Sequence, residues 1–440
     1  MPAIASYDVA VIGGGASGLA AAITAARAGA RTCVIERDVE AGLALLATGN
    51  GRCNISNNAL RPRHYRHPDV AEELFGAHPE HDIAAFFTSL GLELAQEGEG
   101  RLYPITRRAE SVRDVLLAAC SRLGIDILTC SRVTDARQTG IWELTVSAPA
   151  SPLAYKRGHD EKARVRNARK ALASVALADS RLHAASVVLA VGGHVEEVCR
   201  VFLLPHLEER PLLCPIACEL TPALDMASHG ENTLEYLDGL RVEAMASLVR
   251  NGAAIAYEQG EVLFRRYGIS GIAAFNLSRR IEAGDTIELD LFPHLNAANL
   301  ESLLRTREQA IGSFSRSGTW FDGILARRLG ELVTRAVSAS SDQLATAAGL
   351  LHRIPLAVQG TAEPAQAQVR QGGIPFSIID LDTLSLNPST ASASQAGLFA
   401  CGEALDMDAD CGGFNLAWAW LSGMRAGSYA AAHSRKELHA

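Results

Sequence analysis

The sequence has no surplus of basic residues: Lys and Arg number 41 against 49 Asp and Glu, a formal net charge of -8. This balance provides no broad cationic surface and argues against a nucleic acid as partner. The first residues lack the basic segment, apolar stretch and small-residue cleavage site of a signal peptide. The longest uncharged run, 9–26, contains a glycine turn and reads as strand and helix rather than as a membrane span. We therefore predict a cytoplasmic protein with no membrane span.

Closely paired cysteines are also missing, although the chain contains nine cysteines. No two of them have the two-residue separation of zinc knuckles and thioredoxin motifs, and Cys214 and Cys218 have no histidine partners nearby. No pair of the kind that disulfide reductases use lies near the predicted nucleotide fold. The cysteines suit a reducing compartment, and we predict no metal site.

A dinucleotide-binding pattern, in contrast, is present at the amino terminus. An apolar run at 9–12 stops at a glycine turn, an alanine-rich helix follows as far as residue 27, and a second strand is predicted at 32–35. Glu36 ends this strand, where a carboxylate would bind ribose hydroxyls, and Arg37 follows it. A tight βα turn without a ligand is the alternative. The turn residues predicted to face a pyrophosphate at the helix start are Gly13, Gly15, Ala16, Ser17 and Gly18.

A second stretch, at 48–54, is too rich in glycine and asparagine for a helix interior. Glycines permit close backbone approach, asparagines offer amide groups, and Arg52 could bind a phosphate or a reduced, anionic ring. A surface turn stabilised by the asparagine side chains is the alternative. The predicted cofactor-binding loop consists of Thr48, Gly49, Asn50, Gly51, Arg52 and Cys53.

Three later segments each combine glycine with the end of a strand or the start of a helix. A buried strand at 186–191 and a short strand at 397–401 each close on glycine, and a helix is predicted over 416–425. Free N–H groups at the start of that helix would stabilise negative charge on a ring that receives a hydride. The residues predicted to contact the cofactor here are Gly192, Gly193, Gly402, Glu403, Gly412, Gly413, Phe414 and Asn415.

The segments GGGASG, LLATGNGRCNISN and GLFACGEALDMDADCGGFNLAWAWLSG together resemble the HI0933-like flavoproteins, also known as YhiN- or BaiN-like NAD(P)/FAD-dependent oxidoreductases. Landmarks at 100–104, 260–264, 268–271 and 372–374 agree, so the resemblance covers nearly the whole chain. It implies FAD as cofactor, with the backbone at Val133 meeting the adenine and Glu403 binding the ribityl chain. The chain departs from the family pattern at Leu43 and Ala44, where relatives have a basic pair, and after Gly193, where they have a Ser-, Pro- and Gly-rich loop.

The order of the patterns predicts an α/β fold with an insertion. Residues 125–129 are predicted to form a strand that continues to Val133. The basic segment 148–170 is predicted to be an exposed excursion or, alternatively, a basic lip of the site that attracts an anionic substrate. The resemblance implies a Rossmann-type flavoprotein with two dinucleotide-binding folds and inserted β-barrel-like and small helical domains. The predicted domains are 1–210, the first part of the FAD-binding domain; 211–295, the β insertion; 296–352, the helical insertion; and 353–440, the return through the β domain and completion of the FAD-binding domain.

The resemblance also implies a function, an FAD-dependent oxidoreductase that passes hydride from NAD(P)H to an activated C=C bond, such as the enone of a steroid or bile acid. A flavin-dependent oxidase of a small amine such as aminoacetone and a non-catalytic flavin-binding protein are the alternatives. No second glycine fingerprint for NAD(P)H is present, so a nicotinamide would bind transiently. The candidates for proton donation or substrate binding are Tyr103, Arg101 and His194. A purely structural role is the alternative for Tyr103 and Arg101, and a surface position without a role in the reaction is the alternative for His194.

Overall fold

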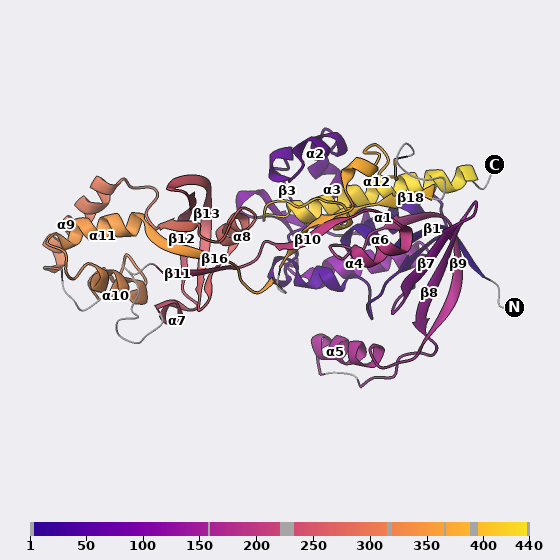
Figure 1. Ribbon diagram of the computed structural model, residues 1–440, viewed down its shortest axis with the longest axis horizontal. Helices are drawn as coiled ribbons and strands as arrows, with labels where there is room; N and C mark the ends of the chain where they lie inside the picture. Colours follow the sequence, from indigo (N-terminus) through magenta and orange to yellow (C-terminus); the bar gives the residue numbers. More distant parts are fainter. Residues whose placement is uncertain are drawn as a thin grey trace. The chain divides into compact units, whose positions relative to one another are not determined.

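A computed structural model describes residues 4–156, 159–220, 233–314, 319–364, 367–387 and 395–437. The chain forms two compact units, Met1–Arg210 with Val369–Ala440, and Pro211–Gln368. Figure 1 shows the helices and strands of each unit. Because the second unit interrupts the first, the first unit is built from both ends of the chain.

A seven-stranded sheet forms the centre of the first unit. Its order is β6 (Asp126–Leu128), β2 (Thr32–Ile35), β1 (Ala5–Ile12), β9 (Leu177–Leu189), β8 (Trp142–Pro149) and β7 (Arg132–Gln138), and β18 (Leu398–Ala400) also pairs with β9. β1 runs parallel to β2 and β9, with Val9 opposite Thr32 and Ser186. β7, β8 and the first half of β9 form an antiparallel meander, whereas the second half of β9 pairs with β1 and β18.

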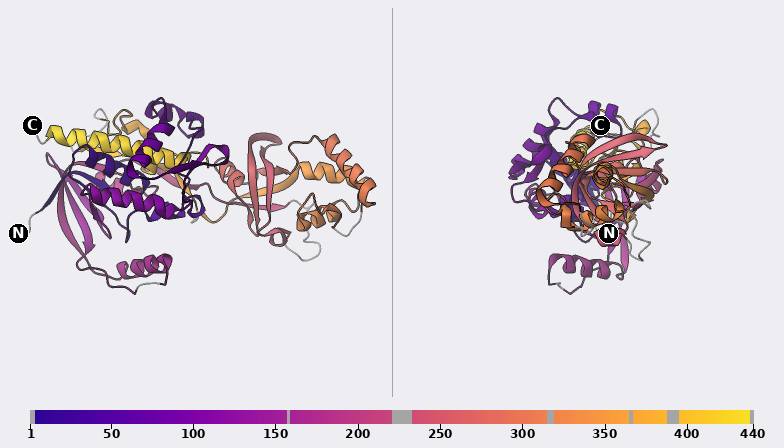
Figure 2. Two further views of the ribbon diagram at one scale, coloured as in Figure 1. Left: turned by 180° about the vertical axis from the view of Figure 1, so that it is seen from behind. Right: turned by 90° about the vertical axis from the view of Figure 1, so that its left-hand side faces the viewer.

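Helices cover this sheet and join the two ends of the chain. α1 (Ala16–Arg27) packs along α12 (Phe414–Glu437), which Figure 2 shows in yellow running along the unit. The two helices approach closely because α12 has glycines at the contact: a Cβ at Gly423 would lie 2.4 Å from the carbonyl oxygen of Ser17, and one at Gly427 would lie 2.2 Å from that of Ala21. The other α-helices of this unit are α2 (Pro68–Leu74), α3 (Pro79–Leu90), α4 (Ala109–Arg122), α5 (Glu161–Leu172) and α6 (Glu196–Phe202).

Shorter elements of the first unit surround the carboxyl ends of its parallel strands. η1 (Leu43–Gly51) leads into a small sheet of β3 (Ser56–Asn57), β5 (Arg101–Pro104) and β4 (Leu94–Gln96), with η2 (Pro62–His64) and η3 (Gly98–Gly100) between them. The strands β10 (Leu207–Leu212) and β17 (Val369–Gly373) pair where the chain leaves and re-enters the unit. η7 (Phe376–Ile378) and η9 (Gly402–Ala404) flank β18.

The second unit is a closed barrel with a helical part. The barrel order is β11 (Ile216–Leu220), β14 (Gly268–Ser270), β13 (Ala253–Arg265), β12 (Arg241–Arg250), β15 (Thr286–Asp290) and β16 (Ile354–Thr361). α7 (Thr233–Leu237) and α8 (Ile272–Ser278) contribute to the barrel core, which includes Phe264 and Leu277. α9 (Ala297–Ile311), η5 (Thr319–Phe321), α10 (Arg327–Ala336) and α11 (Gln343–His352) enclose a separate core around Trp320 and Phe321.

The predicted α/β class with inserted barrel and helices is confirmed. One local prediction is wrong. Residues 125–133 do not form one strand, because the chain turns at Cys130, with φ of +55°, between β6 and β7. The segment predicted as an exposed excursion projects at the tip of the β8–β9 hairpin (Figure 2). It contains the regular helix α5, which was not predicted and which ion pairs bind to other parts of the unit.

Candidate flavin site

The turn between β1 and α1 contains glycines for two different reasons. Gly13 has φ of +106°, and a Cβ there would lie 2.3 Å from the carbonyl oxygen of Ala190; at Gly18 it would lie 1.9 Å from that of Gly13. At Gly15, by contrast, an added Cβ would meet no atom within 4 Å. The packing of the protein therefore explains Gly13 and Gly18, whereas Gly15 leaves open space in front of α1. The first N–H groups of a helix have no intrahelical partner, so this space suits a phosphate.

Glu36, at the end of β2, reaches the glycine turn. Its carboxylate accepts the N–H of Gly14 at 2.6 Å and that of Asp38 at 2.7 Å. The Glu36 carbonyl accepts the N–H of Ser131 at 2.9 Å, which brings the start of β7, with the buried Val133, to this loop. Arg37 is exposed. The structure thus places Glu36 beside the turn, and Val133 near it, as a site for adenosine requires.

The 48–53 loop has a backbone that an ordinary helix does not adopt. Gly49, Asn50, Gly51 and Cys53 all have positive φ, between +54° and +81°. The N–H of Cys53 donates to the carbonyl oxygen of Thr48 at 3.1 Å and closes the loop. Burial raises the pKa of the Cys53 thiol to about 11, so this cysteine is an uncharged packing residue and not a nucleophile.

The side chain of Arg52 is engaged with the small sheet. Its guanidinium lies 2.5 Å from Glu97 and 4.4 Å from the centroid of the Tyr103 ring. Arg107 binds the other oxygen of Glu97 at 2.5 Å, and hydrogen bonds from these guanidiniums, that of Arg52 first, lower the pKa of Glu97. Tyr103 is buried and Arg101 half-buried, both on β5. The structure brings Tyr103 to the 48–53 loop; the catalytic roles of Tyr103 and Arg101 stay predictions.

The loop that opens α12 meets this same region from the other end of the chain. Asn57 Nδ2 donates to the carbonyl oxygen of Gly412 at 3.1 Å, and a Cβ at Gly413 would lie 2.5 Å from the carbonyl oxygen of Ser56. Asn415 closes the loop, accepting the N–H of Ala409 and donating to its carbonyl, both at 2.9 Å. Phe414 is buried at the first position of the helix.

Two buried polar atoms at this junction have no hydrogen-bond partner in the part of the chain that the structure describes. They are Asn54 Oδ1 and Ser56 Oγ, and both residues lie against the position of Gly413. Unpartnered buried oxygens are costly, at about 1–3 kcal/mol each, and they indicate a polar ligand or water. A flavin ring, which carries both carbonyl oxygens and an N–H group along its pyrimidine end, fits these groups.

Gly193 and Glu403 meet between the two predicted glycine turns. A Cβ at Gly193 would lie 2.6 Å from Glu403 Oε1, and that oxygen accepts the N–H of Arg370 at 2.6 Å. Burial raises the pKa of Glu403 to about 7, with the charges of Glu209 and Asp408 adding to the effect and Arg370 opposing it. Gly402 is held by Ser422 and lies against Ser17, and Gly192 has φ of +68°.

His194 follows this turn and is exposed. Its pKa is lowered, first by partial desolvation of the ring against its neighbours and then by the positive charges of Arg370 and Arg37. A lowered pKa leaves the imidazole mostly neutral at pH 7, so His194 is better suited to accept a hydrogen bond than to act as an acid there. Its catalytic role stays a prediction.

Sequence reasoning missed a histidine–aspartate pair beside α12. His64 Nδ1 lies 3.2 Å from Asp410 Oδ2, and the ring stacks on Phe414 at 4.1 Å between centroids. His64 Nε2 is buried without a hydrogen-bond partner among the described residues. The N–H of Asp410 donates to the carbonyl oxygen of His64 at 3.0 Å, which fixes the two residues side by side. His64 and Asp410 are 346 residues apart in the sequence, so no local sequence signal could have predicted that they form a pair.

These residues together fit FAD. Gly15 and the start of α1 would hold the pyrophosphate, Glu36 and the Val133 backbone the adenosine, and Glu403 the ribityl chain. The 48–54 loop and the start of α12 would hold the flavin ring. No cluster of three or more His, Cys, Asp or Glu that could hold a metal occurs within the described ranges, and none of the described helices is long and apolar enough to cross a membrane.

Comparison with known proteins identifies the family of the chain. Residues 7–197 match the HI0933-like protein Rossmann domain, and residues 222–369 match the HI0933-like protein barrel and H2TH domain. The chain belongs to the HI0933-like family. It is accordingly an FAD-dependent oxidoreductase, and the predicted family is confirmed.

Curated relatives of two kinds are similar along nearly their whole length. The chain is 28% identical to the 3-dehydro-bile acid delta(4,6)-reductase of Clostridium scindens, over 96% of this chain and 98% of that protein. It is 22% identical to the ribosomal RNA dihydrouridine synthase of Haemophilus influenzae, covering 94% and 95%, and 23% identical to that of Escherichia coli, covering 94% and 96%. Among solved structures, the 3-ketosteroid delta1-dehydrogenase of Sterolibacterium denitrificans aligns over 97% of this chain and 99% of that chain, with a TM-score of 0.47 and 11% identity.

Proposed function

We propose that this protein is an NAD(P)H-dependent reductase of a C=C bond conjugated to a carbonyl group, with a steroid-type enone as substrate. The observation that carries the proposal is the end-to-end similarity to the bile acid reductase. In the balanced reaction NAD(P)H gives a hydride to the carbon distant from the carbonyl, and the neighbouring carbon takes a proton. The products are NAD(P)+ and the saturated ketone.

A second candidate is the reduction of a uridine in RNA, which the two dihydrouridine synthases support. Dihydrouridine differs from uridine by hydrogen added to a C=C bond next to a carbonyl, so both kinds of relative act on the same type of bond. The charge of the chain favours the smaller substrate: the net charge is -8, and within 211–368 acidic residues outnumber basic ones.

Different residues of the proposed site would have different roles in such a reaction. When bound, FAD supplies the relay of a hydride from the nicotinamide to carbon. The N–H groups at the start of α12 would stabilise the negative charge that a hydride brings to the pyrimidine end of the ring. The buried, protonated Cys53 thiol packs beneath the 48–53 loop and would not compete as a nucleophile. Tyr103 and Arg101 remain the proposed groups for proton donation or for binding the substrate carbonyl. The neutral imidazole of His194 would instead contribute a hydrogen bond to the substrate.

Anaerobic flavin spectroscopy tests the proposal. The FAD-loaded protein is first titrated with NADPH or NADH, and we expect its yellow colour to bleach. A 3-oxo-Δ4 steroid should then restore the colour, whereas the matched saturated ketosteroid, which lacks the C=C bond, should not. Restoration by a uridine-containing RNA alone would support the second candidate, and bleaching by aminoacetone instead of NAD(P)H would support an amine oxidase. Colour that no donor bleaches would contradict all of these activities.

A further inference from the structure

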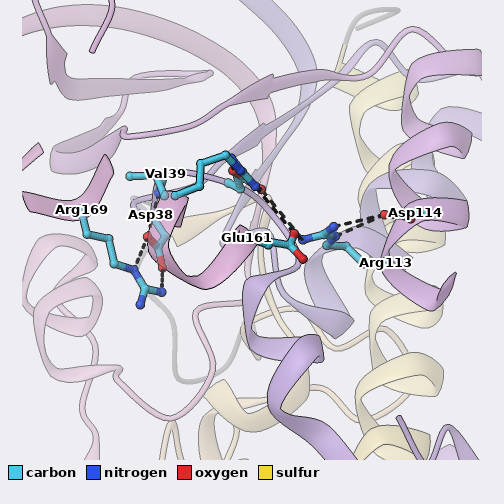
Figure 3. A network of polar contacts seen from close by, with 8 residues as sticks. Asp38, Val39, Arg113, Asp114, Glu161 and Arg169 are labelled. Carbon is cyan, nitrogen blue, oxygen red and sulfur yellow. Dashed lines mark hydrogen bonds and ion pairs between the residues drawn. The ribbon is translucent and has the colours of Figure 1, made fainter. Parts of the chain in front are cut away.

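Helix α5 is bound to the loop behind Glu36 by a set of ion pairs, here called the α5 ion-pair cluster. Arg169 donates from Nε to Asp38 Oδ1 at 2.9 Å and from Nη2 to Oδ2 (Figure 3), and Arg164 binds both carboxylate oxygens of Glu40. From α4, Arg113 donates to Glu161, in the first turn of α5, at 2.6 Å. The cluster consists of Arg113, Arg164, Arg169, Asp38, Glu40 and Glu161.

The loop that this cluster holds is the one that would bind the adenosine of FAD. Glu36, Asp38 and Glu40 place three carboxylates within five residues, directly after the strand that ends beside the glycine turn. The carbonyl oxygens of Glu36 and Asp38 accept N–H groups from residues 130 and 131, which lead to Val133. Without neighbouring cations, these carboxylates would repel one another and the pyrophosphate of the cofactor.

The three arginines remove that repulsion. Burial tends to raise the pKa of Asp38, yet the hydrogen bonds from Arg169 and the Val39 N–H, and the charges of Arg169 and Arg37, lower it overall. The stem of Arg113 also packs on the same loop, because a Cβ at Gly42 would lie 2.6 Å from its Cγ. Only 11% of the Arg113 side chain is exposed, so solvent and salt screen this cation less than the others.

We propose that the α5 ion-pair cluster is a positioning device for the adenosine half of FAD. Its arginines neutralise Asp38 and Glu40 and hold the 36–42 loop in the conformation that presents Glu36. They act through the loop and touch no reacting atom. The opposite face of α5 takes no part: Lys162, Arg166 and Lys170, at four-residue spacing, are all exposed.

The test compares the affinities of FAD and FMN, since FMN lacks the adenosine half. Apoprotein is titrated with each flavin, and binding is followed by flavin fluorescence. For Arg164→Gln with Arg169→Gln we expect FAD binding to weaken roughly tenfold, as the loss of two partly exposed ion pairs suggests, with FMN binding unchanged. High salt should weaken FAD binding by wild-type protein more than by this variant. The matched control is Arg166→Gln with Lys170→Gln, on the exposed face, which should leave both affinities unchanged.

A charge exchange distinguishes positioning from general stabilisation. Arg164→Glu alone should weaken FAD binding, and its combination with Glu40→Arg should recover most of the loss. An unchanged FAD affinity in the double glutamine variant, or an equal loss of FAD and FMN binding, would overturn the proposal. If the double glutamine variant unfolds at the temperature of the titration, Arg169→Gln alone is titrated with FAD and FMN instead. An unchanged FAD affinity, or an equal loss of FAD and FMN binding, would again overturn the proposal. These experiments measure binding only, so their result is independent of which substrate the enzyme reduces.

Discussion

Gly15 is the residue whose identity the protein's own packing leaves unexplained. Its φ of -82° is open to any residue, and a side chain there would meet no protein atom within 4 Å. We predict that Gly15→Val changes the stability of the apoprotein by only about 1 kcal/mol, the scale of an N-cap substitution, while it lowers FAD affinity by about 100-fold or more. Thermal melting and flavin titration measure the two effects separately.

Gly18 provides the matched control for this prediction. The same substitution, Gly18→Val, would drive its Cβ into the carbonyl oxygen of Gly13, so the apoprotein itself should fail to fold or melt far earlier. Full FAD binding by Gly15→Val would show that the open space in front of α1 is not where the cofactor lies.

Glu403 makes the stability of the apoprotein depend on pH. Its folded pKa of about 7 lies above the ordinary value of 4.5, so the folded state binds the proton more tightly than the unfolded chain. The stability that this proton provides is complete below the unfolded pKa and is lost as pH rises through about 7. Glu403→Gln, which keeps an acceptor for the Arg370 N–H, should remove this loss and be more stable than wild type at pH 8 by on the order of 2 kcal/mol.

Denaturant unfolding of wild type and Glu403→Gln at pH 5 and pH 8 measures this difference. The control is Glu197→Gln, at an exposed carboxylate on α6, which should show no such change between the two pH values. If the free energy of unfolding changed equally between pH 5 and pH 8 in wild type and Glu403→Gln, Glu403 would be ionised in the folded apoprotein.

Among the elements, the α1–α12 pair links the two predicted halves of the cofactor site. α1 begins at the glycine turn, α12 begins at the loop proposed to hold the flavin ring, and a Cβ at Gly427 would lie 2.2 Å from the carbonyl oxygen of Ala21 on α1. Gly427→Leu should force the helices apart, lower the free energy of unfolding by about 2–3 kcal/mol and weaken FAD binding. Ser428→Leu, at the exposed next position, should do neither. Equal melting temperatures for the two variants would contradict this account of the packing.

How far the sequence predicts an element depends on where its stabilising contacts come from. β1, α1 and β2 were predictable because their apolar periodicity and the glycine turn are local. α5 was not predictable, since it has few large apolar residues and is held by ion pairs to residues far away in the sequence. Arg164 and Glu40 are 124 residues apart, and Arg169 and Asp38 are 131 residues apart. The turn at Cys130 was missed for the same reason: its N–H binds the carbonyl oxygen of Asp38, and nothing in the local sequence demands positive φ there.

The candidate site was predictable in its glycines but not in its side-chain chemistry. Glycines at 13, 18 and 413 follow from the close approach of neighbouring backbone, and Gly15 follows from the open space in front of α1; the sequence pattern expresses both directly. The orphaned oxygens of Asn54 and Ser56 and the His64–Asp410 pair depend on two chain segments meeting in the folded unit. Arg52, predicted to meet an anion, lies against Glu97 and Tyr103, because the small sheet brings Tyr103 of β5 and Glu97, directly after β4, to the loop.

For the whole molecule, both ends of the chain build the unit that contains the proposed flavin site, and a barrel with a helical part interrupts the sequence between them. The most direct test is a calorimetric and spectroscopic titration of the wild-type apoprotein with FAD. We predict that one FAD binds per chain, with a shifted visible spectrum and far higher affinity than FMN, because in the proposed site Gly15, Glu36 and Glu403 would hold parts of the cofactor beyond the ring. A chain that binds no FAD, or that binds FMN as tightly as FAD, would contradict the account.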